Sequence, residues 1–211
     1  MPTKAQIDEQ FDSARLAVSR KTSKEHKSAF GQFLTNTRIA HVMASLVTSD
    51  GFNSCKLLDP GAGLGALTAA FLERWKTGDL RFSHIDTTAY ELDERLRGEL
   101  CATISKYAQM RRISTRVIPG DFIEQAVLSI QGFGEERHRF THAILNPPYK
   151  KIGSNSMHRH FFRKAGIETV NLYSGFVGLT IRLRKHMDKS SPSFREVSAM
   201  VRIIGRSATC F

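Results

Sequence analysis

The sequence predicts an α/β fold, in which helices cover both faces of a parallel sheet. Short apolar segments alternate with longer stretches of helical periodicity between residues 37 and 183. A glycine-rich turn follows the first apolar segment, where such a fold places a ligand-binding loop. The 211 residues are enough for about one domain with a core, since 41% of them are hydrophobic.

The pattern predicts strands and helices in alternation. The expected strands are residues 56–59, 84–90, 115–118 and 140–145. The expected helices are residues 37–48, 66–75, 92–107 and 169–183, with a shorter helix around 127–130. Glycine and proline punctuate the ends of the first, third and fourth strands, which supports these boundaries.

The character of the sequence divides the chain into three parts. Residues 1–30 are polar and rich in lysine and serine, so we expect a helical or flexible lead-in. Residues 31–183 carry the alternating pattern and form the expected core. From about Arg184 neither periodicity continues, so we expect a sheet that is incomplete at its C-terminal side and a disordered or out-of-frame tail over 184–211.

The composition narrows the functional classes. The chain has 31 Lys and Arg against 20 Asp and Glu, a formal charge of +11 that suits a polyanionic partner. No apolar run reaches membrane-spanning length and no apolar signal segment is visible, so we expect a cytoplasmic protein with no membrane partner. Three scattered cysteines predict neither a disulfide framework nor a metal site. We expect His158 and His160, in a basic loop over 150–164, to be solvated or to face phosphate.

A glycine-rich segment, Asp59–Gly65, lies between the first expected strand and the following helix. Glycines let the backbone turn tightly and approach a ligand, and the helix start offers free N–H groups. The spacing matches neither the nucleotide phosphate loop nor the GxGxxG dinucleotide pattern. We interpret Asp59, Gly61, Gly63 and Gly65 as part of a site for a nucleoside-type cofactor; an ordinary strand-to-helix turn is the alternative.

Two acidic residues follow the next strands, at the edge where open sheets bind ligands. Glu91 ends the second expected strand and can accept both hydroxyls of a ribose. Asp121 follows the third and can accept from an adenine amino group, while the ring of Phe122 can pack on the base. Solvated carboxylates near helix starts are the alternative interpretation.

The tetrapeptide NPPY at residues 146–149 is the most specific signal in the chain. Its two prolines hold a rigid corner at the end of the fourth expected strand. The side-chain carbonyl of Asn146 and the backbone carbonyl of Pro147 can accept the two hydrogens of a planar exocyclic amine. Tyr149 adds a ring face for stacking a base. We therefore interpret the whole corner as catalytic, namely Asn146, Pro147, Pro148 and Tyr149; a proline-rich turn is the alternative.

Together these motifs resemble the class I S-adenosylmethionine-dependent methyltransferases, and among them the N6-adenine DNA methyltransferases. The order of the motifs is that of the γ-type enzymes, closest to the Eco57I-like group, over about residues 28–183. The resemblance implies a Rossmann-like sheet, S-adenosylmethionine as cofactor and a flipped DNA adenine as substrate. It also implies a restriction-modification system, with a restriction subunit or a target-recognition domain as partner.

The resemblance also assigns a role to the segment before the first core helix. Gly31–Thr35 (GQFLT) looks like the element that packs on the methionine part of the cofactor. This implies cofactor contacts by Gln32, Phe33 and Thr35. Asn36 departs from the family pattern, which has proline after the threonine.

Two other functions share parts of this pattern. The NPPY corner is also found in methyltransferases that act on an RNA base or a protein glutamine, although the GQFLT element favours the DNA enzymes. A non-catalytic fragment that binds nucleic acid or a partner is the second alternative. Labelled-methyl transfer to DNA, RNA and protein, together with calorimetry of cofactor binding, distinguishes the three.

A frameshift near residue 184 would explain why the family pattern stops there. Codons permitted for residues 189–207, read from the third base, can give VVAIIPRSFCNGTYYRPF, a buried strand followed by PRSF. That segment resembles the next part of a methyltransferase, so we expect a truncated enzyme with weak cofactor binding and little or no activity. The nucleotide sequence of the gene tests this hypothesis.

Overall fold

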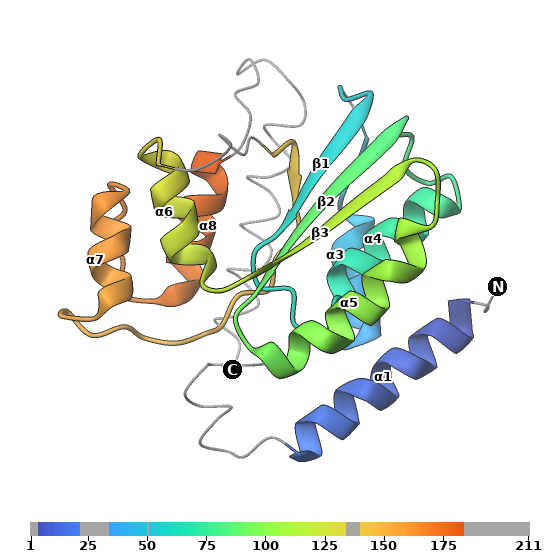
Figure 1. Cartoon of the computed structure of the whole chain (residues 1–211), viewed down its shortest axis with the longest axis horizontal. Helices are drawn as coiled ribbons and strands as arrows, with labels where there is room; N and C mark the ends of the chain where they lie inside the picture. Colours follow the sequence, from blue (N-terminus) through green and yellow to red (C-terminus); the bar gives the residue numbers. More distant parts are fainter. Residues whose placement is uncertain (1–3, 22–33, 50, 134–139, 184–211) are drawn as a thin grey trace.

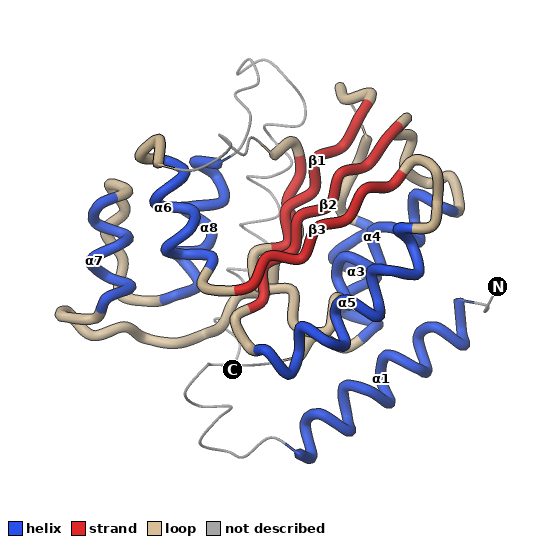
Figure 2. The backbone as a smooth tube through the Cα atoms, in the orientation of Figure 1, coloured by secondary structure: helices blue, strands red, loops and turns tan. Residues whose placement is uncertain are grey.

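The computed structural model describes residues 4–21, 34–49, 51–133 and 140–183. Within them, a parallel sheet of four strands has the order β3-β2-β1-β4. The strands are β1 (Ser54–Asp59), β2 (His84–Glu91), β3 (Ile113–Pro119) and β4 (His142–Ala143). Helices lie on both sides of this sheet (Figure 1, Figure 2), so the predicted α/β fold is confirmed.

The helices form two groups separated by the sheet (Figure 1). The first group consists of α3 (Thr37–Ser45), α4 (Ala66–Lys76) and α5 (Glu94–Ala108). The second consists of α6 (Phe122–Ile130), α7 (Met157–Lys164) and α8 (Leu172–Leu183). Outside the first group lies α1 (Lys4–Lys21), which contacts α3 through a 2.9 Å hydrogen bond from Thr37 Oγ1 to Asp12 Oδ2.

Strand β1 is buried on both faces and joins two separate parts of the core. Leu57 packs into the cluster formed with α3 and α4, whereas Leu58 packs into the cluster formed with α6 and α8. Neither side chain is exposed to solvent. Successive residues of a strand point to opposite faces, so a strand covered on both sides has a continuous apolar run. This is why the short segment at 56–59 is recognisable in the sequence.

Two predicted elements have different lengths in the structure. The strand expected at 140–145 is reduced to β4, although Ile144 N still donates to Leu58 O at 2.9 Å. The helix expected around 127–130 begins five residues earlier, at Phe122. Asp121 Oδ1 accepts from Ile123 N at 2.8 Å and so satisfies a free amide of the first turn.

The prediction of a basic loop over residues 150–164 is wrong for the second half of the segment, where Met157–Lys164 form helix α7. Ser156 Oγ caps this helix by accepting from Arg159 N at 3.2 Å. Phe162 anchors it, since the ring is fully buried against Gly175 of α8. The many basic residues of this segment favour a solvated loop in the sequence, and only the packing of Phe162 shows that one face of the segment is buried.

Several predicted features lie outside the described residues. They include the tail over 184–211, with its proposed frameshift, and the expected cofactor residues Gln32 and Phe33. Among the described helices, none is both long enough and apolar enough to cross a membrane.

Candidate active site

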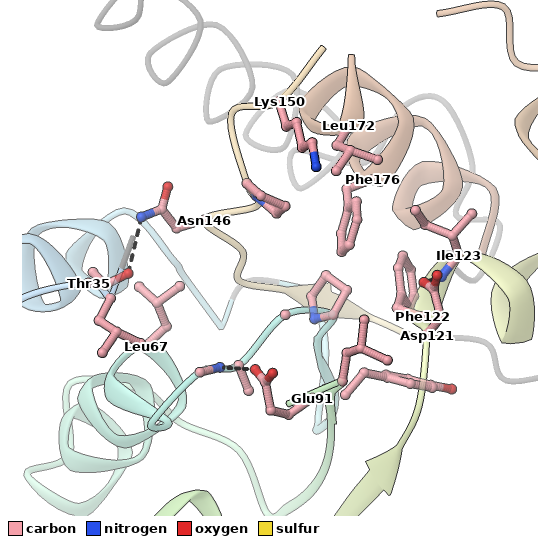
Figure 3. Close-up of a pocket in the computed structure, with 18 of the residues that line it drawn as sticks. Thr35, Leu67, Glu91, Asp121, Phe122, Ile123, Asn146, Lys150, Leu172 and Phe176 are labelled. Carbon is pink, nitrogen blue, oxygen red and sulfur yellow. Dashed lines mark hydrogen bonds between the residues drawn. The ribbon is translucent and has the colours of Figure 1, made fainter. Parts of the chain in front are cut away.

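A cavity of about 370 Å³ opens at the carboxyl ends of the central strands (Figure 3). Strand β1 has β2 and β3 on one side and β4 on the other, so the strand order reverses next to it. Open α/β sheets bind ligands at such a switch point. The volume lies within the range of small-molecule sites. The position and size together indicate a ligand site built by the turns that follow β1, β2, β3 and β4.

The glycine-rich turn forms one wall of this cavity. Gly63 and Gly65 have positive φ angles of 57° and 85°, a conformation that glycine adopts without strain. Gly61 and Gly63 line the cavity, whereas Gly65 does not. A Cβ on Gly65 would lie 2.8 Å from Leu100 Cδ1, so this glycine allows α4 to begin close to α5.

Glu91 joins the end of β2 to the glycine turn. Its Oε2 accepts from Gly63 N at 2.7 Å (Figure 3), and its Oε1 accepts from Asp93 N at 2.8 Å. Burial raises the pKa of this carboxyl group, although the two amides oppose the shift. A carboxylate offers about four acceptor positions, so both oxygens retain capacity for ribose hydroxyls. Glu91 therefore supports the turn and also faces the cavity.

Asp59 does not line the cavity, in contrast to the other acidic residues of the predicted site. Its side chain is fully buried beneath the turn, and Thr68 Oγ1 donates to Asp59 Oδ2 at 2.7 Å. Burial raises the pKa of Asp59 to about 7, and the nearby Glu91 adds to the shift. The structure therefore places Asp59 behind the glycine turn, where it holds the first turn of α4.

Asp121 and Phe122 lie at the opposite wall of the cavity, after β3 (Figure 3). Asp121 Oδ2 lies 2.7 Å from Nε2 of His158, a residue of α7 that also lines the cavity. The basic sequence around His158 predicts a ring that is solvated or faces phosphate. In the structure this ring instead contacts the carboxylate of Asp121. Phe122 is 2% exposed and packs its ring against Tyr90 and Phe176.

The NPPY corner lies at the end of β4, beside the cavity. Asn146 and Pro148 line the cavity, whereas Pro147 and Tyr149 do not. The Asn146 Nδ2 group donates to Thr35 Oγ1 at 3.1 Å (Figure 3). Thr35 therefore lies at the cavity, in contact with the NPPY corner.

Tyr149 is 47% exposed and stacks on Tyr173, with ring centroids 5.1 Å apart and planes tilted by 16°. This is a stacked aromatic pair, which the sequence did not indicate. Tyr173 is the second residue of α8, so this stacked pair connects the NPPY corner to that helix.

Sequence reasoning also missed the apolar wall of the cavity. Leu172 and Phe176 project from α8 towards the glycine turn and Asn146 (Figure 3). Phe11 and Arg15 reach the cavity from α1. None of these residues belongs to a local motif, so only the packing of their helices brings them to the site. Among the described residues, no group of three or more His, Cys, Asp and Glu side chains could hold a metal ion.

Comparison with solved structures decides the fold family. A protein of Listeria monocytogenes, described as a class I S-adenosylmethionine-dependent methyltransferase, matches with a TM-score of 0.63 and 11% identity. The match covers 94% of this chain and 59% of that protein. The chain has the class I methyltransferase fold. A modification subunit assigned to a type I restriction enzyme from Vibrio vulnificus shares this methyltransferase fold, with a TM-score of 0.57 and 14% identity over 88% of this chain and 37% of that one.

Two curated methyltransferases are similar in sequence. The type II methyltransferase M.BsuBI of Bacillus subtilis is 46% identical over 182 residues, which cover 84% of this chain and 36% of the relative. The type II methyltransferase M.PstI of Providencia stuartii is 33% identical over 182 residues, which cover 82% and 34%. The chain therefore spans about a third of the length of these relatives. No protein-family model matches the sequence.

Proposed function

We propose that the chain carries the cofactor site and the catalytic corner of a type II DNA methyltransferase that acts on adenine N6. The observation that carries this proposal is the position of Asn146 at the end of β4, facing the cavity that the glycine turn lines. Similarity to two type II methyltransferases supports the substrate class. The resemblance to the γ-type adenine enzymes, on the motifs at 59–65 and 146–149, supports the target atom.

The residues at the cavity fit S-adenosylmethionine. Glu91 offers carboxylate oxygens for a ribose, and Asp121 offers an acceptor for an adenine amino group. Gly61 and Gly63 bring bare backbone to the cavity, where side chains would reduce the space. When bound, S-adenosylmethionine supplies a methyl group on a positively charged sulfur. Thr35 and the α8 wall, with Phe176, would complete its surroundings.

The NPPY corner would hold the amine that accepts the methyl group. The Asn146 Oδ1 atom and the Pro147 carbonyl oxygen would each accept one hydrogen from the adenine amine. This would orient the nitrogen lone pair towards the cavity for in-line transfer of the methyl group, and the amine would release one proton to solvent. Positioning of this kind contributes much of the rate in reactions that need little acid–base chemistry. Tyr149 would stack on the base after the base leaves the duplex.

Cationic side chains beside the corner suit a DNA partner. Lys150 and Lys151 follow the tetrapeptide directly and lie at the cavity. Residues 1–183 alone carry 25 basic and 18 acidic residues, a formal charge of +7. Lysine and arginine side chains contact the phosphate backbone of DNA, and such contacts add affinity without base specificity. We propose a restriction subunit or a target-recognition domain as the further partner.

The variant Asn146→Asp tests the proposed reaction. We expect methyl transfer to adenine to fall by about 100-fold or more, because a carboxylate cannot donate to Thr35 and so loses the hydrogen bond that orients this side chain. Binding of S-adenosylmethionine should stay within about threefold of the parent chain, since the cofactor contacts lie on other turns. Tritiated methyl transfer to unmethylated genomic DNA, followed by nucleoside analysis, and calorimetry measure the two quantities.

Asn53→Asp is the matched control, because Asn53 is exposed and precedes β1, at the opposite end of the strands from the cavity. This control should leave both quantities unchanged. Label in RNA or in protein glutamine instead of DNA would overturn the proposed substrate. Equal DNA methylation by the parent chain and Asn146→Asp would overturn the proposed role of the corner. Cofactor binding without any transfer by the parent chain would overturn the enzyme assignment in favour of a non-catalytic fragment.

A further inference from the structure

Thr35 contacts the proposed catalytic corner through a hydrogen bond across the cavity mouth. Its Oγ1 accepts from Asn146 Nδ2 at 3.1 Å, although the two residues are 111 positions apart in the chain. Both side chains are partly buried and both line the cavity. Figure 3 shows that the Asn146 amide nitrogen points to Thr35 while the amide oxygen points away from it. This hydrogen bond points to a role for Thr35 that is distinct from a cofactor contact.

The backbone before α3 holds Thr35 in this place. Asn36, the next residue, is the N-cap of α3 and accepts from Ile39 N at 2.9 Å through its Oδ1. Thr37, the first residue of the helix, donates to Asp12 of α1. Thr35 is therefore anchored directly ahead of a capped helix start. The departure at Asn36 from the family's proline has a structural explanation, because this residue supplies the cap.

The geometry of an amide links the two ends of the Asn146 side chain. The amide is planar, so a hydrogen bond that fixes Nδ2 also fixes the direction of Oδ1. Rotation by 180° would present the NH₂ group to the incoming amine, and two donors would then face each other. An unrestrained amide would populate both orientations, and only one of them can accept from the substrate.

We infer that Thr35 is a positioning residue, whose hydroxyl accepts from the Asn146 amide and thereby orients the Asn146 carbonyl oxygen towards the substrate amine. This inference rests on the proposed function, because it gives Thr35 a role in the same reaction. It assigns the hydroxyl to Asn146, whereas the resemblance implied a contact with the cofactor. The expected effect of its loss is therefore on the rate of transfer and only weakly on cofactor affinity.

Thr35→Val and Thr35→Ser separate the two roles, because valine keeps the shape of threonine and serine keeps its hydroxyl. For Thr35→Val we expect a transfer rate about 10-fold lower at saturating S-adenosylmethionine, with cofactor affinity within about threefold. Thr35→Ser should transfer at close to the parental rate. Thr77→Val is the matched control, since Thr77 is exposed at the C-cap of α4 and its hydroxyl donates to Arg74 O. A valine variant that loses affinity but recovers its rate at saturating cofactor would overturn the inference.

The side-chain amide of Asn146 gives a readout that does not depend on activity. Its two amide proton resonances, which share one ¹⁵N shift, can be assigned by their loss in Asn146→Asp. In the parent chain and in Thr35→Ser we expect slow hydrogen exchange, and in Thr35→Val faster exchange with shifts typical of a free amide. If the parent chain methylates no DNA, the proposed function fails, while this spectrum still decides the hydrogen bond. Identical Asn146 resonances in the parent and Thr35→Val would overturn the inference.

Discussion

At the scale of single residues, Asp59 shows how a motif position can have a role that its pattern does not reveal. It ends β1 and begins the glycine segment, which in sequence suggests a cofactor contact. In the structure its carboxyl group is completely buried and accepts from Thr68 of α4. The direction of the side chain at the last residue of a strand depends on the pleat and on the turn, and neither is evident from residue type.

The buried carboxyl group of Asp59 predicts a pH-dependent stability. Its pKa is raised to about 7 in the folded chain, against an ordinary value of 3.8. Between these two pKa values the folded state holds a proton that the unfolded state releases. The contribution of Asp59 to the free energy of unfolding is therefore fully present below pH 3.8 and is lost as the pH rises to about 7. In urea unfolding, this group should lower the free energy of unfolding of the parent chain by up to about 1.4 kcal/mol for each pH unit in that range. Asp59→Asn should remove this pH dependence. Asp79→Asn is the exposed control, and parallel curves for Asp59→Asn and the parent would contradict the prediction.

At the scale of elements, the boundaries that the sequence predicted well are those with local chemical signals. Proline and glycine end β1 and β3, and both strands lie where they were expected. For α6, Asp121 was interpreted as an adenine contact, with a solvated carboxylate near a helix start as the alternative, and the helix was predicted too short because the cap at Asp121 was not used to place its first residue. Helix α7 has a capping serine but few apolar residues, and its packing against Gly175 depends on a partner helix.

The turn between β1 and α4 gives a prediction about two glycines. Gly65 and Gly78 have nearly equal φ angles of 85° and 88°, but a Cβ would contact Leu100 only at Gly65. Gly65→Ala should lower the free energy of unfolding by about 2–4 kcal/mol, from backbone strain plus the clash at 2.8 Å. Gly78→Ala should cost about 1 kcal/mol from strain alone. Denaturant unfolding measures both, and equal losses would show that the close approach of α4 and α5 contributes nothing.

At the scale of the whole molecule, the cavity joins segments that are far apart in sequence. Its lining runs from Phe11 in α1 to Phe176 in α8 and includes turns from both sides of β1. A ligand held there contacts elements of both core clusters, so its binding opposes unfolding of the entire described fold. This follows from linkage, because a ligand that binds only the folded state stabilises it by mass action.

S-adenosylmethionine should therefore raise the melting temperature of the chain. At 100 times its dissociation constant the stabilisation is about 2.7 kcal/mol, which corresponds to about 5–10 °C for a domain of this size. Differential scanning calorimetry at several cofactor concentrations measures the shift, with ATP as a control nucleotide that has no sulfonium group. A melting temperature that does not change with S-adenosylmethionine would contradict the proposed cofactor site.

The sequence by itself determined the alternation of strands and helices apart from α7, the glycine turn and the NPPY corner, because periodicity and turn chemistry are local properties of the chain. It also predicted that Glu91 and Asp121 lie at one edge, because parallel strands end on the same side. Only the tertiary structure decided that Asp59 faces the core, that Phe176 closes the cavity and that Thr35 meets Asn146. The physical reason is that these contacts join residues brought together by helix packing on both faces of the sheet, and no local pattern encodes such distances.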